Sequence, residues 1–404
     1  MEVVYSRCCG LDVHKKKVTA CVMVPEGQQV RSFGTMTREL EKMADWLASQ
    51  GVTHLAMEST GVYWRPVYNL LEGRGLTLLV VNAQHIKAVP GRKTDVKDAE
   101  WIADLLRHGL LRGSVIPDRR WRELRELVRY RISLVRQRSQ VVQRVQKVLE
   151  GANIKLSSVA TDILGRSGRE MLEGIIAGRY DPEALADLAR GRLKQKRPEL
   201  AEALRGLVGA HQRLLLESML GNLDTLGGEI DRLSTEIAGR LHPYQDILDR
   251  LDTIPGVGRR AAEQLLAEIG PDVSRFPTPA HLASWAKVCP GNDRSAGKRK
   301  SASTGHGNPW LRSTLVEIAW AAARTRHTYL SAQYHRLAAR RGSQRAVVAV
   351  GHSILVIVYH LLKEGGEYRE LGENYFDECA RQEVVRRTVR RLERLGYKVS
   401  IEAA

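Results

Sequence analysis

Four acidic residues near the amino-terminal end are the strongest candidates for chemistry in this chain. Asp12 closes a short apolar run in GLDVHKK, and Glu58 closes another in THLAMES. Asp95 and Asp98 lie three residues apart in KTDVKDAEWIADLL, so a helix that contains both presents them on one face. Carboxylate oxygens are the ligands that Mg²⁺ and Mn²⁺ prefer, and two such ions can promote phosphoryl transfer. The acids therefore predict a metal-dependent nuclease or strand-transfer site if the fold brings them together.

A single one of these acids indicates little by itself. Asp95 and Asp98 are also residues that the helix macrodipole favours at the start of a helix. Strand alternation places His14 on the same face as Asp12, where it is more often a packed histidine than a metal ligand. The prediction rests on the set, and all four members are assigned to metal binding and catalysis: Asp12, Glu58, Asp95 and Asp98.

A basic segment rich in Ser and Gly holds a candidate nucleophile in the second half of the chain. It reads CPGNDRSAGKRKSASTGHGNPWLRSTL and predicts a loop before a helix. A serine hydroxyl among cations can attack a phosphodiester, because nearby positive charge stabilises the pentavalent transition state. The cations are Arg294, Lys298, Arg299 and Lys300. Such segments are also common as flexible surface loops, so composition alone leaves the role open.

The stretch DTIPGVGRRAAEQLLAEIG resembles a helix-hairpin-helix element, in which a glycine turn precedes a helix. Gly256 and Gly258 would let the backbone approach a phosphate at the positive end of that helix. The alternative is an ordinary tight turn between two helices.

The elements that position these residues fall into an α/β part followed by helical parts. Within residues 1–117, three strand patterns (SRCCGLDVH, VTACVMVP and QVRSFGTM) precede a helix, the strand THLAMES, another helix and the strand LTLLVVN. This order is typical of a ribonuclease H-like sheet, although the pattern alone establishes only an α/β fold.

The sequence pattern of residues 118–245 predicts a helical connector. Its first helix, residues 119–149, has apolar residues seven apart in two adjacent rows, which predicts a coiled-coil or bundle seam. The same helix carries ten Lys or Arg and two acidic residues, so its outer face either follows a phosphate backbone or is a solvated structural surface. An amphipathic run is predicted over residues 199–241. Residues 246–373 predict a second compact, mostly helical domain, and residues 374–404 a basic amphipathic tail.

Composition narrows the class of partner. The chain has 404 residues, a formal net charge of +17 and a pI near 9.8, which favours nucleic acid over a charge that serves solubility alone. The five cysteines show no zinc spacing and are expected to be reduced core thiols. The first residues lack the features of a signal peptide, which predicts a cytoplasmic protein. The apolar run at 346–362 is expected to be a core helix too short to cross a membrane.

Three motifs resemble those of transposases of the insertion sequence 110 family: GLDVHKK, MESTGVYW and KTDVKDAEWIA. The resemblance implies a RuvC-like, ribonuclease H-like domain in which the four acids form a DEDD metal-binding tetrad. It also implies a carboxy-terminal transposase domain whose serine becomes covalently joined to DNA. The pattern S-x-G-K before a G-N/D-x-x-L-R element assigns that serine to Ser295, with Ser301 and Ser303 as alternatives.

The same resemblance implies recombination between element ends and target DNA, guided by a structured non-coding bridge RNA. It further implies a dimer or tetramer with composite active sites. Composition does not indicate RNA guidance, but a basic chain is compatible with it.

The leading prediction is a DNA transposase that cleaves and rejoins strands with metal-binding acids and a serine nucleophile. One alternative is a RuvC-like, metal-dependent junction endonuclease that leaves free ends and no serine-linked DNA. Another is a non-enzymatic nucleic-acid scaffold, which would bind tightly and salt-sensitively without metal-dependent cutting.

Overall fold

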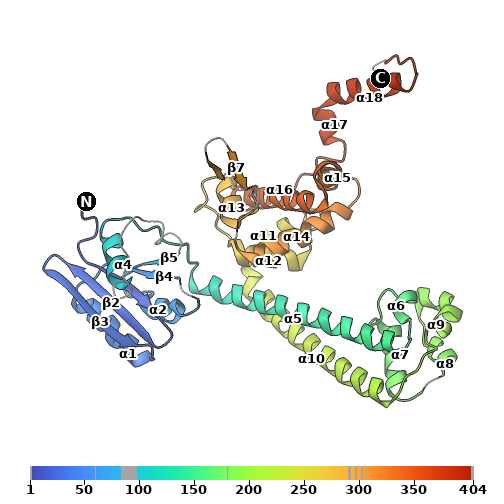
Figure 1. The fold of residues 1–404 in the computed structure, drawn as a ribbon, viewed down its shortest axis with the longest axis horizontal. Coiled ribbons are helices and arrows are strands. Elements are labelled where there is room, and N and C mark those ends of the chain that lie inside the picture. The colour runs from blue at the N-terminus through green and yellow to red at the C-terminus, as the bar shows by residue number, and fades with distance from the viewer. Residues whose placement is uncertain are drawn as a thin grey trace. The chain divides into compact units, whose positions relative to one another are not determined.

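The computed structural model describes residues 2–59, 61–82, 98–179, 181–289, 293–295, 298–301, 304–305 and 307–401. It divides into two compact units, Met1–Arg119 and Arg120–Ala404. The first is built on a β-sheet, and the second is mostly helical (Figure 1). The expected combination of an α/β amino-terminal part with a helical remainder is therefore confirmed.

The first unit contains a five-stranded sheet in the order β3-β2-β1-β4-β5. Strands β1 (Cys8–Val13), β2 (Lys17–Val24) and β3 (Gly27–Gly34) form an antiparallel meander, because short turns join them. Strands β4 (His54–Glu58) and β5 (Thr77–Val81) continue the sheet parallel to β1. All five strands occur where the alternating sequence pattern predicts them.

Helices cover both faces of this sheet, which explains why β1 is apolar on both sides. Helices α1 (Thr37–Ser49) and α2 (Trp64–Leu71) pack on the face that carries Leu11 and Met57. Helix α4 (Asp98–Arg107) packs on the opposite face, against Cys8 and Ala56.

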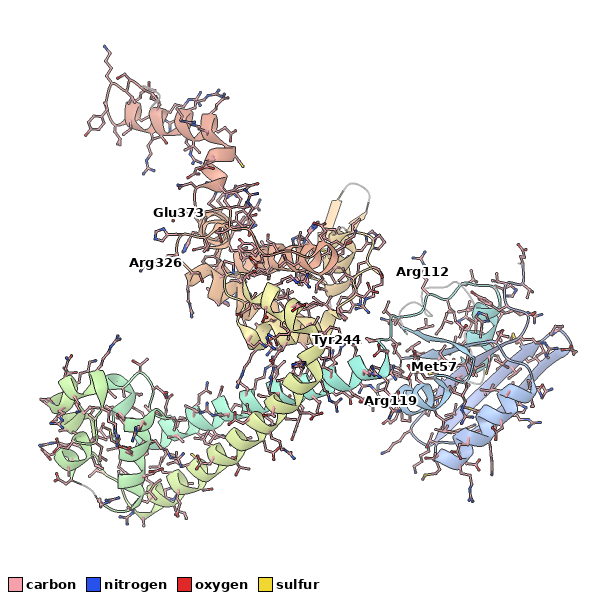
Figure 2. The ribbon with its side chains drawn as sticks, turned by 180° about the vertical axis from the view of Figure 1, so that it is seen from behind. Met57, Arg112, Arg119, Tyr244, Arg326 and Glu373 are labelled. Carbon is pink, nitrogen blue, oxygen red and sulfur yellow. The ribbon has the colours of Figure 1, made fainter. Side chains whose placement is uncertain are left out.

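Two long helices form the arm of the second unit and lie side by side in both views (Figures 1 and 2). They are α5 (Arg119–Gly151) and α10 (Ala210–Leu241). They run antiparallel, since Arg240 near the end of α10 pairs with Glu123 near the start of α5 at 3.3 Å. The predicted seam is present, although its buried residues come from both heptad rows, while Val135 is 38% exposed.

Short helices close the far end of the arm. They are α6 (Leu156–Val159), α7 (Arg166–Ile176), α8 (Pro182–Ala186), the 3-10 helix η1 (Gly191–Lys196) and α9 (Arg197–Ala203). The prediction of one amphipathic run over 199–241 was wrong, because α9 ends at Ala203 and α10 begins at Ala210. Gly206 lies in this break, where a Cβ atom would approach the Ala152 carbonyl oxygen to 2.3 Å.

The remaining helices build a bundle around α16. After the 3-10 helix η2 (His242–Tyr244) come α11 (Gln245–Asp252), α12 (Arg259–Ile269), α13 (Pro279–Ala286), α14 (Pro309–Arg324), α15 (Tyr329–Arg341), α16 (Ser343–Glu364), α17 (Tyr375–Cys379) and α18 (Arg381–Arg394). A two-stranded hairpin, β6 (Asp293–Ser295) and β7 (Lys298–Ser301), lies between α13 and α14.

Helix α16 is longer than expected. It spans 22 residues and is long and apolar enough to cross a membrane, so the prediction that it is too short was wrong. Half of its most apolar window is nevertheless buried inside the protein, and Val350, Ile354 and Val358 are fully buried. These residues pack in the bundle core, as predicted for a core helix.

Candidate active site and nucleic-acid interface

Asp12 and Glu58 end two adjacent parallel strands. Leu11 of β1 pairs with Met57 of β4, so the two acids follow at neighbouring positions, and residues in register on parallel strands point to the same face. Adjacent strands lie about 4.8 Å apart, so the two acids are backbone neighbours at this end of the sheet. Met57, the residue before Glu58, is fully buried in the core of the first unit and is labelled in Figure 2.

Helix α4 brings Asp98 towards the same end of the sheet. A Cβ atom on Gly10 would lie 2.3 Å from the Ala99 carbonyl oxygen, so only glycine lets α4 pack this closely on β1. The helix ends beside the start of the chain, because the Arg107 carbonyl accepts hydrogen bonds from the Val4 and Tyr5 amides. Its first residue, Asp98, is therefore directed towards the end of β1 that carries Asp12.

The surroundings of Asp12 include a histidine but not a complete metal site. His14 Nε2 lies 3.0 Å from Asp12 Oδ2, and the Asp12 side chain is 26% exposed. Asp95 lies outside the described residues, so its position relative to the other acids stays a prediction. Within the described part of the chain, no three His, Cys, Asp or Glu side chains are grouped closely enough to hold a metal ion.

The thiols near these acids are unsuited to nucleophilic chemistry. Burial raises the pKa of Cys8 to about 11 and that of Cys21 to about 12, and it raises the pKa of Cys9 well above its ordinary value. They are protonated at neutral pH and belong to the core, as predicted. Cys379 is exposed and Cys289 is partly buried, so the expectation of core thiols was wrong for Cys379.

The segment with the candidate serine forms a hairpin rather than the predicted loop. Ser295 pairs with Lys298 and Arg294 with Arg299 along the backbone of β6 and β7. Lys300 also lies on β7, while Ser303 lies outside the described residues. The hairpin therefore keeps Ser295 and its basic neighbours in one short stretch of backbone.

Two family models match the chain, and each covers one of these regions. A model described as a transposase, of the DEDD type of insertion sequence 110, matches residues 9–154. A second, described as "Transposase IS116/IS110/IS902 family", matches residues 248–336. The chain belongs to the insertion sequence 110 family of transposases. The resemblance in the sequence motifs is thus confirmed at the level of the family.

A relative from Streptomyces coelicolor agrees with the assignment to insertion sequence 110 transposases. The chain is 28% identical over 309 residues to the "Insertion element IS110 uncharacterized 43.6 kDa protein", across 69% of this chain and 73% of that protein. Transposases are DNA-processing enzymes, so DNA is the partner that family membership supplies. The candidate acids and Ser295 all lie within the two matched regions.

The IPGVG turn of this transposase joins α11 to α12, and its two glycines differ. Gly256 has a φ of +87°, and a Cβ atom there would lie 2.5 Å from the Ala322 amide nitrogen of α14. Its backbone faces protein, so packing rather than phosphate approach explains this glycine. Gly258 caps α12, and a Cβ atom there would contact nothing within 4 Å. Of the two predicted contacts, Gly258 has the open space that a phosphate requires.

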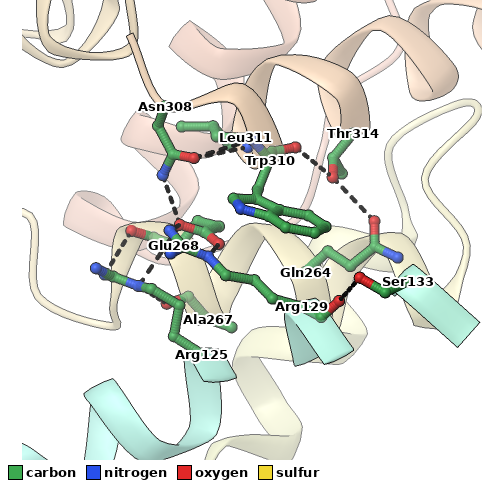
Figure 3. A network of polar contacts seen from close by, with 10 residues as sticks. All are labelled: Arg125, Arg129, Ser133, Gln264, Ala267, Glu268, Asn308, Trp310, Leu311 and Thr314. Carbon is green, nitrogen blue, oxygen red and sulfur yellow. Dashed lines mark hydrogen bonds and ion pairs between the residues drawn. The ribbon is translucent and has the colours of Figure 1, made fainter. Parts of the chain in front are cut away.

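Sequence reasoning missed a buried polar network between α5, α12 and α14 (Figure 3). Glu268 is 2% exposed, and its carboxylate accepts from Arg129 Nε at 2.7 Å and Nη2 at 2.8 Å. The amide of Asn308 donates to the same carboxylate, and the Asn308 oxygen caps α14 by accepting from the Trp310 and Leu311 amides. The network therefore fixes the start of α14, a few residues after the hairpin.

These contacts correct part of the prediction for the basic face of α5. Arg125 donates to the carbonyls of Ala267 and Glu268, and buried Arg131 lies 2.7 Å from Glu263. Together with Arg129, these arginines bind residues of α12 inside the protein, so they are not phosphate contacts. Arg138, Arg144 and Lys147 remain exposed along the arm. The only sequence signal for the network was the presence of three polar residues, Glu263, Gln264 and Glu268, in the mainly apolar AAEQLLAEI run.

Proposed function

We propose that this transposase cleaves and rejoins the DNA strands of its insertion sequence by means of acids in the first unit and a serine in the second. The observation that carries the proposal is the placement of Asp12 and Glu58 at adjacent strand ends, with α4 starting at Asp98 on the same face. Acids separated by dozens of residues in sequence then serve one phosphate group.

The proposed metal ligands are Asp12, Glu58, Asp95 and Asp98. Their donor chemistry fits Mg²⁺ or Mn²⁺, because carboxylate oxygens are the hard ligands that these ions prefer. When bound, the cation would neutralise charge that develops on the phosphoryl oxygens. The acids' own role is to orient it, and β1 and β4 keep the separation of the first two fixed.

The sheet order supports a RuvC-like, ribonuclease H-like assignment for this domain, since a meander precedes parallel strands added at β1. The helix-turn-helix geometry of α11 and α12 similarly supports a helix-hairpin-helix element. The proposed boundaries lie at residues 117, 245 and 373, and they separate the catalytic domain, the connector, the transposase domain and the tail.

Ser295 is the proposed nucleophile. Its hydroxyl oxygen forms a bond to phosphorus while the phosphorus–oxygen bond to the leaving strand breaks, and the leaving oxygen takes up a proton. Reversal with a different strand hydroxyl rejoins the DNA and releases the serine. Arg294, Lys298, Arg299 and Lys300 would stabilise the developing negative charge.

The proposed partners extend beyond element ends and target DNA. Family membership supports a bridge RNA as guide and a dimer or tetramer with composite active sites. The exposed basic residues of the arm are compatible with holding both nucleic acids.

The covalent intermediate gives the sharpest test. The full chain is incubated with Mg²⁺, element-end DNA and RNA transcribed from the adjacent non-coding segment, and protein–DNA adducts are separated under denaturing conditions. Ser295→Ala should abolish adducts while DNA binding persists, and Ser301→Ala and Ser303→Ala serve as matched controls. Adducts that persist in Ser295→Ala reject this serine. Metal-dependent free ends without any adduct in the wild type indicate the junction endonuclease instead.

A further inference from the structure

The carboxy-terminal helix α18 carries a stripe of arginines that the proposed reaction does not use. Arginines at positions i, i+1, i+4, i+5 and i+8 occupy neighbouring rows on one side of the helix. They are Arg386, Arg387, Arg390, Arg391 and Arg394, and all are exposed. Like charges at this spacing repel one another, so the stripe weakens the isolated helix unless an anionic partner covers it.

These arginines line a groove of about 860 Å³ together with Arg336 of α15. Arg336 pairs with Asp377 of α17 at 2.5 Å and lies 5.4 Å from the ring centre of Phe376. These contacts fasten α17, and with it the start of α18, to the bundle. The groove is thus attached to folded protein and is more than a free tail.

The charge of the groove lacks internal compensation. Among the residues that the structure describes, none of the five α18 arginines has an ion pair or a side-chain hydrogen bond, and Glu383 is the one acid in the lining. Some exposed arginines of the second unit are paired, as Arg232 is with Glu229, and others, such as Arg138 on α5, have no ion pair among the described residues. What distinguishes α18 is the concentration of five such arginines on one side of one helix, with a single acid in the groove, and this density of positive charge points to an external anion.

The lining also indicates which feature of that anion is recognised. No aromatic ring or side-chain amide lines the groove, so arginine is the group left to recognise the anion there. Successive arginines one helical turn apart, about 6 Å, can follow a row of phosphates. We infer that the α15–α18 groove binds the phosphodiester backbone of duplex nucleic acid, as a contact additional to the proposed active site.

This inference rests on the proposed function only for the class of partner. Its failure is distinguishable, because binding is measured separately from the serine-linked adducts. A basic amphipathic helix can also lie on an anionic membrane, and that outcome is included in the test.

The experiment compares two full-length variants with the same change in net charge. One is Arg386→Gln/Arg387→Gln/Arg390→Gln/Arg391→Gln. The control replaces four exposed arginines that are paired with acids: Arg166, Arg190, Arg205 and Arg232. Because α18 has no buried residue, the first variant should retain the fold, which circular dichroism checks.

Fluorescence anisotropy measures the Kd for labelled DNA and RNA duplexes of equal sequence over about 50 to 200 mM salt. The Kd of the α18 variant should be at least about tenfold higher for the DNA duplex, the RNA duplex or both. The duplex whose Kd rises is the one that the groove binds. Each phosphate contact contributes about −0.9 to the slope of log K against log salt concentration for duplex DNA. The loss of four contacts should therefore make this slope shallower by about 3.6. The control should change Kd much less.

Binding of both variants to phosphatidylserine vesicles is measured in parallel. Three results would overturn the inference: unchanged duplex binding by the α18 variant, equal weakening of duplex binding in both variants, or an α18 variant that loses binding to the vesicles alone.

Discussion

Two pairs of acids, one in each unit, show how the surroundings of a carboxylate separate a reactive role from a structural one. Glu263 and Glu268 are 5% and 2% exposed and are held by arginines of α5. Asp12 and Glu58 form the other pair, at the ends of β1 and β4. Asp12 is 26% exposed, and the side chain beside it is His14. A carboxylate already neutralised by arginine is a poor metal ligand, whereas one at an open strand end can still bind a cation.

The largest expected effect is on DNA cleavage, when one of the strand-end acids is replaced. Asp12→Asn or Glu58→Gln should lower DNA cleavage by at least about 10²- to 10³-fold, because each removes charge that would stabilise the transition state through the metal. Cleavage rates with Mg²⁺ measure this. Asp45→Asn, an exposed acid on α1, is the control. Unchanged cleavage in the strand-end variants would exclude the tetrad.

The largest loss of stability is expected at the structural pair. Glu268→Ala removes the partner of Arg129 and Asn308 and should lower the free energy of unfolding by about 3 kcal/mol. Denaturant unfolding measures the change. Glu229→Ala, which breaks an exposed pair with Arg232, should cost under about 1 kcal/mol. Equal losses would mean that the network of Figure 3 is not a structural anchor.

The packing of α4 gives an intermediate effect. Gly10→Ala places a Cβ atom against the Ala99 carbonyl and should cost about 1 to 3 kcal/mol, with reduced cleavage because Asp98 moves. Gly227→Ala on α10 meets open space and should stabilise the protein by about 0.5 to 1 kcal/mol. Thermal unfolding compares the two, and wild-type cleavage in Gly10→Ala would separate α4 from the site.

The smallest effect concerns the buried thiols. In the folded protein the pKa is about 11 for Cys8 and about 12 for Cys21, against about 9 in the unfolded chain. The contribution of these buried thiols to the free energy of unfolding is therefore intact below pH 9, and it is lost as the pH rises towards the folded pKa values. The free energy of unfolding should therefore fall between pH 9 and 11, by at most about 1.4 kcal/mol per thiol and pH unit. The variant Cys8→Ala/Cys21→Ala should show a flatter decline. An identical decline would contradict the assignment to these thiols.

The sequence predicted the sheet well because alternation along a strand is a local signal. Asp12 and Glu58 were identifiable because each ends an apolar run, and the register then makes them neighbours. The break at 204–209 was visible only as two glycines. Its cause, the approach of Gly206 to Ala152, is a tertiary contact.

The polar network could not be predicted for the same reason. Arg129 and Glu268 are 139 residues apart, and on α5 the internal arginines have the same spacing pattern as the exposed ones. A Ser- and Gly-rich composition also concealed the β6–β7 hairpin, because such residues favour turns in isolation.

Metal binding by the full chain tests the central claim most directly. Titration with Mn²⁺, followed by electron paramagnetic resonance, should show saturable binding in the wild type and in Asp45→Asn. The same signal should be lost in Asp12→Asn and in Glu58→Gln. Saturable binding that survives in both strand-end variants would contradict the account.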